Sequence, residues 1–523
     1  MKAFILRHFS LLQTNLVLSD TFKYTSWFFS LMISAFLLIS LAVPLYQSST
    51  HPGYVFATDN DGGRAIEVSL STRWYNSNHF APYGNLYYRF SQTVADLIPL
   101  HNEGNLTSKE ARGKSHNFAL KIISLFSLFG LGLFVGWALF GFSYVIPLFG
   151  SLFMLVTMQM PMWTEWIFRP HPEHLLNVYI SMAVYTFARF LKDKENVRLF
   201  IFSALAWGLA VAVKRSTSIF IPGILLLLLF PFSKKSMLFT LKYIGYMLLA
   251  YLVVGFPQNF GFYKHIKFLL YESSLHSLGD FSSISQNLKV VGEQLLYLLP
   301  IIVIAAIFSP IKKKLFSKEL VAMVLISFIP ILMRKMSFPG DHHTMPLAIA
   351  VMMVVLIFML QYLPWRINSH LAAAALLLIS IKMIGIPTGY FALQKSQTAC
   401  FNEFDEIMKI VTNKISDQNR FVKEPYFPSV EKIEKFTTAH WGIDWSKISP
   451  DVTFLGVTRN NIKNYLHDPP KDYYGKMVER WDEKKRFYND INNKTIVKSP
   501  AGIEFQKVFS GTICNHELWM AQK

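Results

Sequence analysis

A series of long apolar runs separated by short polar loops constrains this chain more than any other feature. A helix needs roughly 20 apolar residues to cross the hydrocarbon core of a bilayer. The sequence holds about eleven such runs, at 26–46, 118–138, 140–160, 174–191, 198–213, 217–232, 237–256, 291–309, 319–334, 344–363 and 370–390. The runs 198–213 and 217–232 are short, and they predict either two spans or one re-entrant hairpin; both return the chain to the same side. We therefore predict an α-helical polytopic membrane protein.

The amino-acid composition supports this prediction. Charged residues make up 16% of the 523 residues, whereas a soluble domain carries about a quarter. The net charge of +18 does not indicate nucleic-acid binding, because the lysines and arginines are spread over short loops and the last third of the chain. Neither a phosphate-binding Walker loop nor a dinucleotide-binding glycine fingerprint occurs in the sequence, which disfavours a cytoplasmic nucleotide-dependent enzyme.

The positive charges predict the orientation of the spans. Residues 1–25 carry lysine and arginine without a cleavage site, so they predict a cytoplasmic segment before a retained first span. Cytoplasmic loops then include the basic stretches 192–198 and 312–318, in agreement with the positive-inside rule. Residues 26–390 form the predicted transmembrane domain, with 47–117 as its first outer loop.

The tail, 391–523, differs in composition and is predicted to lie outside as a mixed α/β domain. Residues 404–414 have the pattern of an amphipathic helix and residues 452–457 that of a short strand. Cys400 and Cys514 are the two cysteines of the chain. In an extracytoplasmic domain they predict either a disulfide or two unrelated thiols, and the sequence leaves this choice open.

The first outer loop holds a pair of acids, Asp59 and Asp61, directly before Gly62 and Gly63. Residues i and i+2 of an extended segment project to the same side. Both carboxylates could therefore face one substrate, as a general base and a partner that tunes it or helps to hold a metal. The alternative is a simple Asx turn, because the same residues are good turn formers.

Two further outer segments carry polar groups. Residues 79–89 combine aromatic residues, one proline and one glycine, and predict a turn followed by a helix in the interface, with tyrosines at the level of the lipid headgroups. Residues 163–174 place Arg169, His171, Glu173 and His174 at the mouth of an apolar helix. Ionisable groups at membrane depth are functional candidates. A divalent metal is a weaker hypothesis than sugar or phosphate binding, because the spacing is not that of a helical zinc motif.

Several basic groups fall on the predicted outer side, against the general trend. They predict contacts with an anionic lipid headgroup. The candidates for binding a lipid phosphate are Lys214, Arg215, Arg334, Lys335, His342 and His343.

Together these residues resemble the GT-C superfamily of integral membrane glycosyltransferases, and most closely its protein mannosyltransferase and lipid A aminoarabinose transferase branch. The matching elements are the early acids Asp59 and Asp61; Pro82, Gly84, Leu86, Tyr87 and Tyr88; Arg169, Pro170, Glu173 and His174; and Lys214 followed by Pro222. Asn85 stands where the family often has proline, and Asn60 separates the acids, so the choice of base stays open between them.

The resemblance implies an activity and roles for residues. It implies an enzyme that moves a sugar from a polyprenyl-phosphate donor to an acceptor hydroxyl on the outer face, with inversion and with Asp59 or Asp61 as the base. The substrate-binding residues that it implies are Arg169, His171, Glu173, His174, Tyr83, Tyr87 and Tyr88. The resemblance implies no definite cofactor and no need for ATP, and participation of a divalent cation is left open.

Two other functions fit part of the pattern. A lipid-glycan flippase would explain the spans and the outer cations but not the acidic loop, and an O-antigen polymerase or ligase would place its main charged loop later in the chain. The expected location is the bacterial inner membrane with a periplasmic tail. The acceptor patterns for N-glycosylation at Asn105 and Asn493 leave the endoplasmic reticulum as the alternative.

Overall fold

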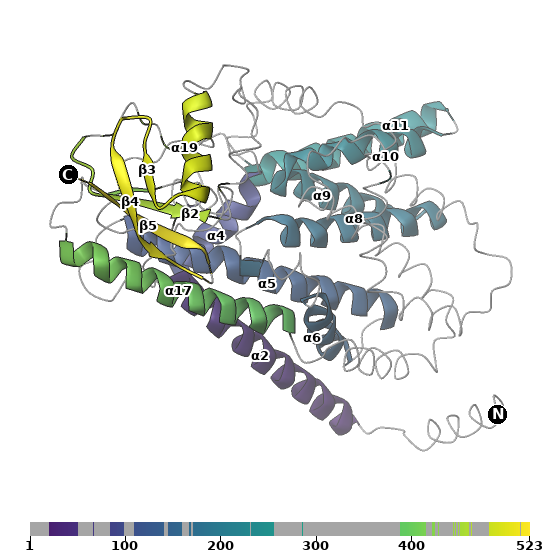
Figure 1. Ribbon diagram of the computed structural model, residues 1–523. Helices are drawn as coiled ribbons and strands as arrows, with labels where there is room; N and C mark the ends of the chain where they lie inside the picture. The colour runs from purple at the N-terminus through teal and green to yellow at the C-terminus, as the bar shows by residue number, and fades with distance from the viewer. Residues whose placement is uncertain are drawn as a thin grey trace.

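The structure is a computed structural model (Figure 1). It describes ten longer continuous segments and a number of short pieces and single residues. The continuous ones are 20–50, 84–98, 109–140, 145–158, 171–230, 232–255, 388–414, 450–459, 481–512 and 514–522. In addition it describes residues 66, 69, 167–168, 285, 421–423, 427, 443, 445, 448 and 462. The predicted spans 291–309, 319–334, 344–363 and nearly all of 370–390 lie outside these residues.

Helices occupy the first seven predicted spans. They are α2 (Asp20–Thr50), α5 (Lys109–Phe140), α6 (Val145–Thr157), α8 (Glu173–Lys192), α9 (Val197–Val213), the pair η2 (Arg215–Phe220) and α10 (Ile221–Leu229), and α11 (Lys234–Gly255). Within the described residues, three helical stretches are long and apolar enough to cross a membrane: Ser26–Thr50, Gly113–Trp137 and Lys234–Gly255. The apolar runs therefore predict helices correctly, while the total number of spans stays a prediction.

The short span after α9 is broken in two. Lys214 leaves the helical conformation, η2 forms one 3-10 segment, and α10 begins with Pro222 in its first turn. Proline suits that position because its missing N–H has no partner there in any helix. At nine residues, α10 is about 14 Å long.

Small residues allow the helices to approach closely. Gly132 of α5 faces Gly150 of α6, and a Cβ at Gly132 would lie 2.7 Å from the Gly150 carbonyl oxygen. Gly208 of α9 meets α11 in the same way, with a Cβ only 2.2 Å from the Met247 carbonyl oxygen. Close backbone approach through small residues is typical of helix packing in membranes.

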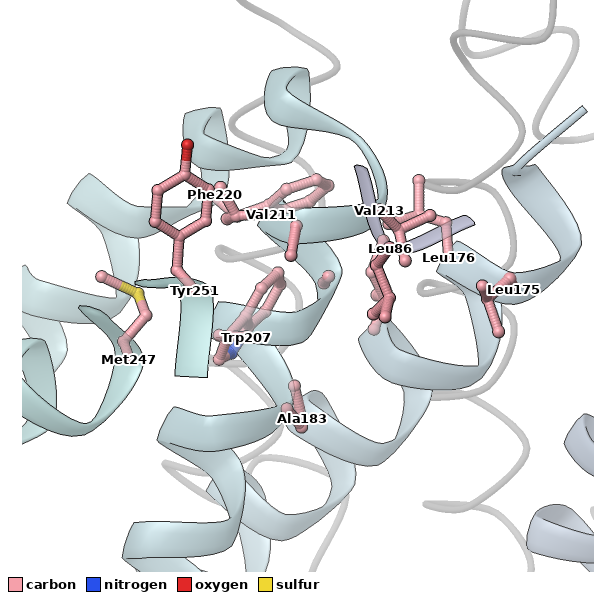
Figure 2. Close-up of a cluster of buried hydrophobic side chains, with 14 of the residues drawn as sticks. Leu86, Leu175, Leu176, Ala183, Trp207, Val211, Val213, Phe220, Met247 and Tyr251 are labelled. Carbon is pink, nitrogen blue, oxygen red and sulfur yellow. The ribbon is translucent and has the colours of Figure 1, made fainter. Parts of the chain in front are cut away.

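Helix α4 (Asn85–Leu97) corrects one expectation. It is a helix, as predicted for this segment, but Tyr87 and Tyr88 are fully buried rather than exposed at a headgroup layer. They pack with Leu86 into the apolar cluster that α4 shares with α5, α8, α9 and α11 (Figure 2). Burial among apolar side chains outweighs a position in the interface, so these tyrosines are not interfacial anchors.

The tail contains a five-stranded sheet of β1 (Phe421–Lys423), β2 (Phe454–Thr458), β3 (Ile496–Lys498), β4 (Glu504–Ser510) and β5 (His516–Ala521), in the order β1-β2-β5-β4-β3. Strand β1 runs parallel to β2, and the other pairs are antiparallel.

The two faces of this sheet are covered by different helices. Leu455 and Trp519 point to the face where α19 (Trp481–Asn493) packs, and their neighbours Phe454 and Leu518 point to the face of α17 (Thr388–Lys414). This alternation is the period of two expected for strands. The described residues of the tail thus contain both helices and strands.

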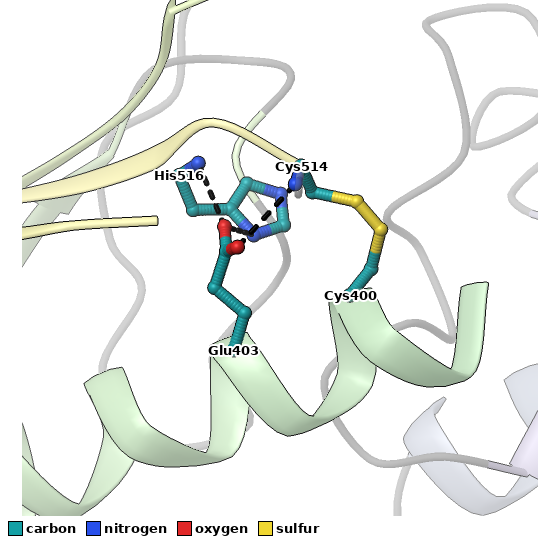
Figure 3. Close-up of a disulfide and its surroundings, with 4 residues drawn as sticks. All are labelled: Cys400, Glu403, Cys514 and His516. Atoms are coloured by element: carbon teal, nitrogen blue, oxygen red, sulfur yellow. Dashed lines mark hydrogen bonds and ion pairs between the residues drawn. A yellow bond between two sulfur atoms is a disulfide. The ribbon is translucent and has the colours of Figure 1, made fainter. Parts of the chain in front are cut away.

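Helix α17 connects the tail to the rest of the chain. It begins at Thr388 and lies alongside α2 (Figure 1). A disulfide joins Cys400 on this helix to Cys514 just before β5, with the two Cα atoms 5.4 Å apart (Figure 3). Of the two alternatives for the cysteines, the structure contains the disulfide.

Candidate functional site

Three segments that stand apart in the sequence meet at one end of the helix bundle. The Gly84 N–H donates a 2.8 Å hydrogen bond to the carbonyl of Val213, so α4 starts directly against the end of α9. A Cβ at position 84 would lie 1.8 Å from the Ala212 carbonyl oxygen, so any residue larger than glycine would force one of the two backbones to shift. Leu86, the second residue of α4, packs beside Val213 and beside Leu176 of α8 (Figure 2).

An ion pair joins the beginning of α8 to the end of α9. Lys214 Nζ lies 2.5 Å from Glu173 Oε1, and the side chains are 5% and 0% exposed. Glu173 is in the first turn of α8, where the helix dipole favours a negative charge. In a buried site two charges interact far more strongly than in water, but both have also lost their hydration. The pair therefore fixes the two helix ends relative to each other.

Two histidines flank this pair. His171 Nδ1 lies 3.5 Å from Glu173 Oε2, and the His171 carbonyl accepts a hydrogen bond from Ser124 of α5. His174, in the first turn of α8, is also buried. The predicted residues His171, Glu173, His174 and Lys214 are thus brought together.

Tyr87 lines the same region from α4. Its hydroxyl donates a 3.3 Å hydrogen bond to the carbonyl of Leu120, and its ring meets that of Tyr88 edge to face. Burial raises the pKa of Tyr87 above its ordinary value; contact with Ser124 acts in the opposite direction, and the charge of Glu173 raises the pKa further. The phenol therefore stays protonated and acts as a hydrogen-bond donor.

Arginine side chains add positive charge at this end of the bundle. Arg215 begins η2, is buried, and interacts electrostatically with Tyr251 of α11. Arg89 of α4 donates a hydrogen bond to the carbonyl of Val254, near the end of α11. The start of α8 and the ends of α9 and α11 therefore gather around α4, all at the predicted outer side.

Sequence reasoning missed several buried polar residues near this site. Lys121 of α5 donates to the carbonyl and hydroxyl oxygens of Ser48, at the end of α2. Ser69, of the first outer loop, hydrogen-bonds to Ser91 and to His116 Nδ1 at 2.7 and 2.6 Å. The signal for Lys121 was present, because it is a single lysine in the apolar run 118–138.

Other predicted site residues lie outside the described part of the chain: Asp59, Asp61, Tyr83, Arg169, Arg334, Lys335, His342 and His343. Their predicted roles are untested. Among the residues that the structure does describe, no three His, Cys, Asp or Glu side chains group in a way that could hold a metal ion.

The chain was compared with known protein families, with curated proteins and with solved structures. No protein-family model matches the sequence, and no curated protein matches it either. Among solved structures, a match is the crystal structure of ArnT from Cupriavidus metallidurans bound to undecaprenyl phosphate. It has 10% sequence identity and a TM-score of 0.48, and the match covers 94% of this chain and 97% of that one. A likeness at this TM-score does not establish a function for this chain.

Proposed function

We propose that the protein is an integral membrane glycosyltransferase that moves a sugar from a polyprenyl-phosphate donor to an acceptor hydroxyl at the outer membrane face. One observation carries the proposal. The segments that resemble GT-C motifs, separated by more than a hundred residues in the sequence, meet in one buried site that contains Gly84, Tyr87, Glu173 and Lys214. Apolar helices in the described residues, long enough to cross a membrane, support a membrane-embedded enzyme.

The cations of this site suit a departing lipid phosphate. Lys214 and Arg215 bring two positive charges, and Glu173 opposes one of them. Preformed charges in a poorly hydrated site stabilise a developing negative charge without having to reorganise. Because Lys214 is already held by Glu173, Arg215 is the contact to the phosphate oxygens in this proposal. Lys214 orients η2, on which Arg215 lies. The predicted roles of Arg334, Lys335, His342 and His343 remain as further phosphate contacts.

The acid that accepts the proton of the acceptor is Asp59 or Asp61. Deprotonated, it takes the hydroxyl proton while the oxygen attacks the anomeric carbon, and the bond from that carbon to the phosphate oxygen breaks. General-base help of this kind contributes about 10²–10⁴-fold. Arg169, His171 and His174, with Tyr83 and Tyr88, shape the sugar side of the site. The phosphate-linked sugar is already activated, so the reaction needs no ATP.

The proposal is tested by incubating the purified chain with radiolabelled polyprenyl-phosphate sugars and extracted cell-envelope acceptors. We expect transfer that falls about 10²–10⁴-fold in Asp59→Asn or in Asp61→Asn. Asp96→Asn is the matched control, because Asp96 is an exposed carboxylate on α4. Full transfer in both single variants and in the double variant would exclude these acids as the base. Lipid-linked sugar that crosses the bilayer of a vesicle without transfer would instead indicate a flippase.

A further inference from the structure

Helix α8 carries a stripe of polar side chains that begins at Glu173 and continues with Asn177 and Ser181, two residues that the proposed chemistry does not use. Glu173, Asn177 and Ser181 are spaced four residues apart and so lie one above another on one face of the helix. All three are buried, and Asn177 and Ser181 are each 1% exposed. From Glu173 to Ser181 the stripe extends about 12 Å along the helix axis, starting at the ion pair with Lys214.

The neighbours of α8 show which way the stripe faces. Tyr185 contacts the rings of Phe134 and Trp137 on α5, and the carbonyl of Ala183 accepts a hydrogen bond from Ser203 on α9. Glu173, Asn177 and Ser181 are all buried, so the stripe lies on the side of α8 that packs against its neighbours α5 and α9. The polar groups therefore point into the bundle and not toward lipid.

Hydrogen bonding sets this stripe apart from other buried hydroxyls. Ser124, Thr157 and Thr186 each donate to the carbonyl four residues earlier on their own helix. Ser181 makes no such bond. Within the described part of the chain, its hydroxyl and both polar atoms of the Asn177 amide are buried without a hydrogen-bond partner. Buried polar groups are nearly always hydrogen-bonded in folded proteins, so an exception calls for an explanation.

We propose that Asn177, with Ser181 one turn further along, recognises the hydroxyl groups of the donor sugar. This inference rests on the proposed glycosyltransferase function and adds to it a residue that determines specificity. An amide offers both donor and acceptor atoms, which can pair with two neighbouring hydroxyls of one sugar ring. Both side chains are uncharged, so they suit the sugar, whereas the cations Lys214 and Arg215 suit the phosphate at the end of the stripe.

The first test uses the direction in which the melting temperature changes, because this direction differs between a residue that contacts a ligand and a residue that holds the fold together. Leucine has the same number and branching of side-chain heavy atoms as asparagine, but none of them is polar. If the amide pairs only with the ligand, Asn177→Leu leaves the melting temperature of the purified full chain unchanged or raises it, because replacing an unpaired buried polar group is neutral or stabilising. Thr186→Val is the control, because its hydroxyl is already bonded within α8.

Lipid binding gives the second measurement. The probes are undecaprenyl phosphate alone and undecaprenyl phosphate linked to a series of hexoses and aminopentoses. We expect Asn177→Leu to weaken the best sugar-linked probe at least about tenfold, as for a lost hydrogen bond to a ligand hydroxyl, and to leave undecaprenyl phosphate unchanged. Ser181→Ala should have a smaller effect in the same direction, and Thr186→Val none. By contrast, Arg215→Ala should weaken both probes.

The outcomes are distinguishable. A lower melting temperature in Asn177→Leu, or equal weakening of both probes, would mean that the amide serves the fold, and it would overturn the inference. If the wild-type chain binds and transfers the sugar, and Asn177→Leu binds and transfers it equally well, the inference is overturned but the proposed function stays in place. A wild-type chain that neither binds nor transfers any sugar-linked probe would overturn both.

Discussion

The bundle site and the tail both bury carboxylates, but they use them differently. In the tail, Glu403 accepts backbone N–H groups of His516 and Cys514, one on each oxygen, at 3.0 and 3.3 Å (Figure 3). Glu517, on the same sheet, accepts from Lys507 and from the Trp519 indole. In the bundle, Glu173 meets Lys214 through Oε1, while its Oε2 lies 3.5 Å from His171 Nδ1.

In the proposed function, this difference separates a region that only holds the fold together from a region that binds a ligand. A carboxylate with both oxygens bonded to the protein locks local structure, and next to Glu403 the disulfide adds a covalent constraint. The bundle instead keeps a charged pair beside Arg215 and beside the polar atoms of Asn177. Mutations in the tail should therefore change stability, whereas mutations in the bundle site should change ligand binding as well.

The largest effect is expected for Lys214→Met. This change leaves Glu173 buried without its cation, and breaking a buried ion pair by removing one partner costs about 3–5 kcal/mol. We expect a strongly lowered melting temperature and weak binding of undecaprenyl phosphate. The double variant Glu173→Gln with Lys214→Met should recover much of the stability, because no uncompensated charge remains, but not the phosphate binding.

An exposed ion pair in the tail provides the control for Lys214. Lys494 directly follows α19, and its Nζ lies 3.0 Å from Oδ1 of Asp490 in the last turn of that helix, with the lysine side chain 58% exposed. Lys494→Met should cost no more than about 0.5 kcal/mol, as is usual for exposed ion pairs of this spacing. Equal melting temperatures for Lys214→Met and Lys494→Met would contradict the role of the buried pair.

The disulfide is expected to affect stability about as much as the buried ion pair does, but not lipid binding. Cys400 and Cys514 are 114 residues apart in the sequence, and closing a loop of that size stabilises a fold by about 4–5 kcal/mol in the chain-entropy model. The double variant Cys400→Ser with Cys514→Ser should lower the denaturant midpoint that tail tryptophan fluorescence reports. Binding of undecaprenyl phosphate should stay at the wild-type level. A loss of lipid binding in this variant would show that the tail also holds the bundle site together.

His516 makes the stability of the tail depend on pH. Burial lowers the pKa of His516 from 6.5 to about 4, although the charge of Glu403 acts in the opposite direction. Between these two pH values the unfolded tail binds a proton that the folded tail does not bind. Stability is therefore complete above about pH 6.5 and decreases as the pH falls toward 4, by up to about 3 kcal/mol.

Thermal melting of the full chain between pH 4 and pH 7 measures this dependence. His516→Gln should flatten it, because glutamine does not titrate. An equally steep slope in that variant would assign the effect to other groups and contradict the prediction for His516.

The sequence predicted the helices better than the contacts between them. Apolar runs located α2, α5 and α11, whose described stretches are long and apolar enough to cross a membrane, because length and hydropathy alone decide whether a segment can span a bilayer. Glu173 and Lys214 were each recognised as candidates, but their pairing depends on how α8 packs against α9, which no local pattern contains. Asn177 was missed because one amide hardly changes the average hydropathy of its run, and only its burial makes it conspicuous.

The resemblance to a family contributed what periodicity could not. It selected Gly84 and Tyr87 as one element, and the structure gives the physical reason for the glycine, which is the contact with the end of α9. Tyr87 was expected at a headgroup layer because aromatic residues are common there. Its burial follows from the same contact, which brings the whole first turn of α4 into the bundle.

That contact also gives the prediction with the smallest expected effect, for Gly84→Ala. The added Cβ would lie 1.8 Å from the Ala212 carbonyl oxygen, so α4 or the end of α9 must shift. The backbone angles of Gly84 suit alanine, with φ −70° and ψ 163°, so the cost arises from crowding alone, and crowding of this kind costs about 1–3 kcal/mol. Gly130→Ala is the matched control, because nothing lies within 4 Å of a Cβ there.

The consequence for function follows from what lies next to the shifted backbone. Lys214 directly follows Val213, whose carbonyl accepts the Gly84 N–H, so a displaced helix end moves the cation away from its place beside Glu173. Gly84→Ala should therefore weaken undecaprenyl phosphate binding by more than its modest loss of stability suggests, and Gly130→Ala should leave both quantities unchanged. If Gly84→Ala lowered the melting temperature but bound the lipid phosphate normally, the end of α9 would contribute to stability alone, as the tail does, and not to ligand binding. The contrast between the two regions would then rest on Arg215 and Asn177 alone.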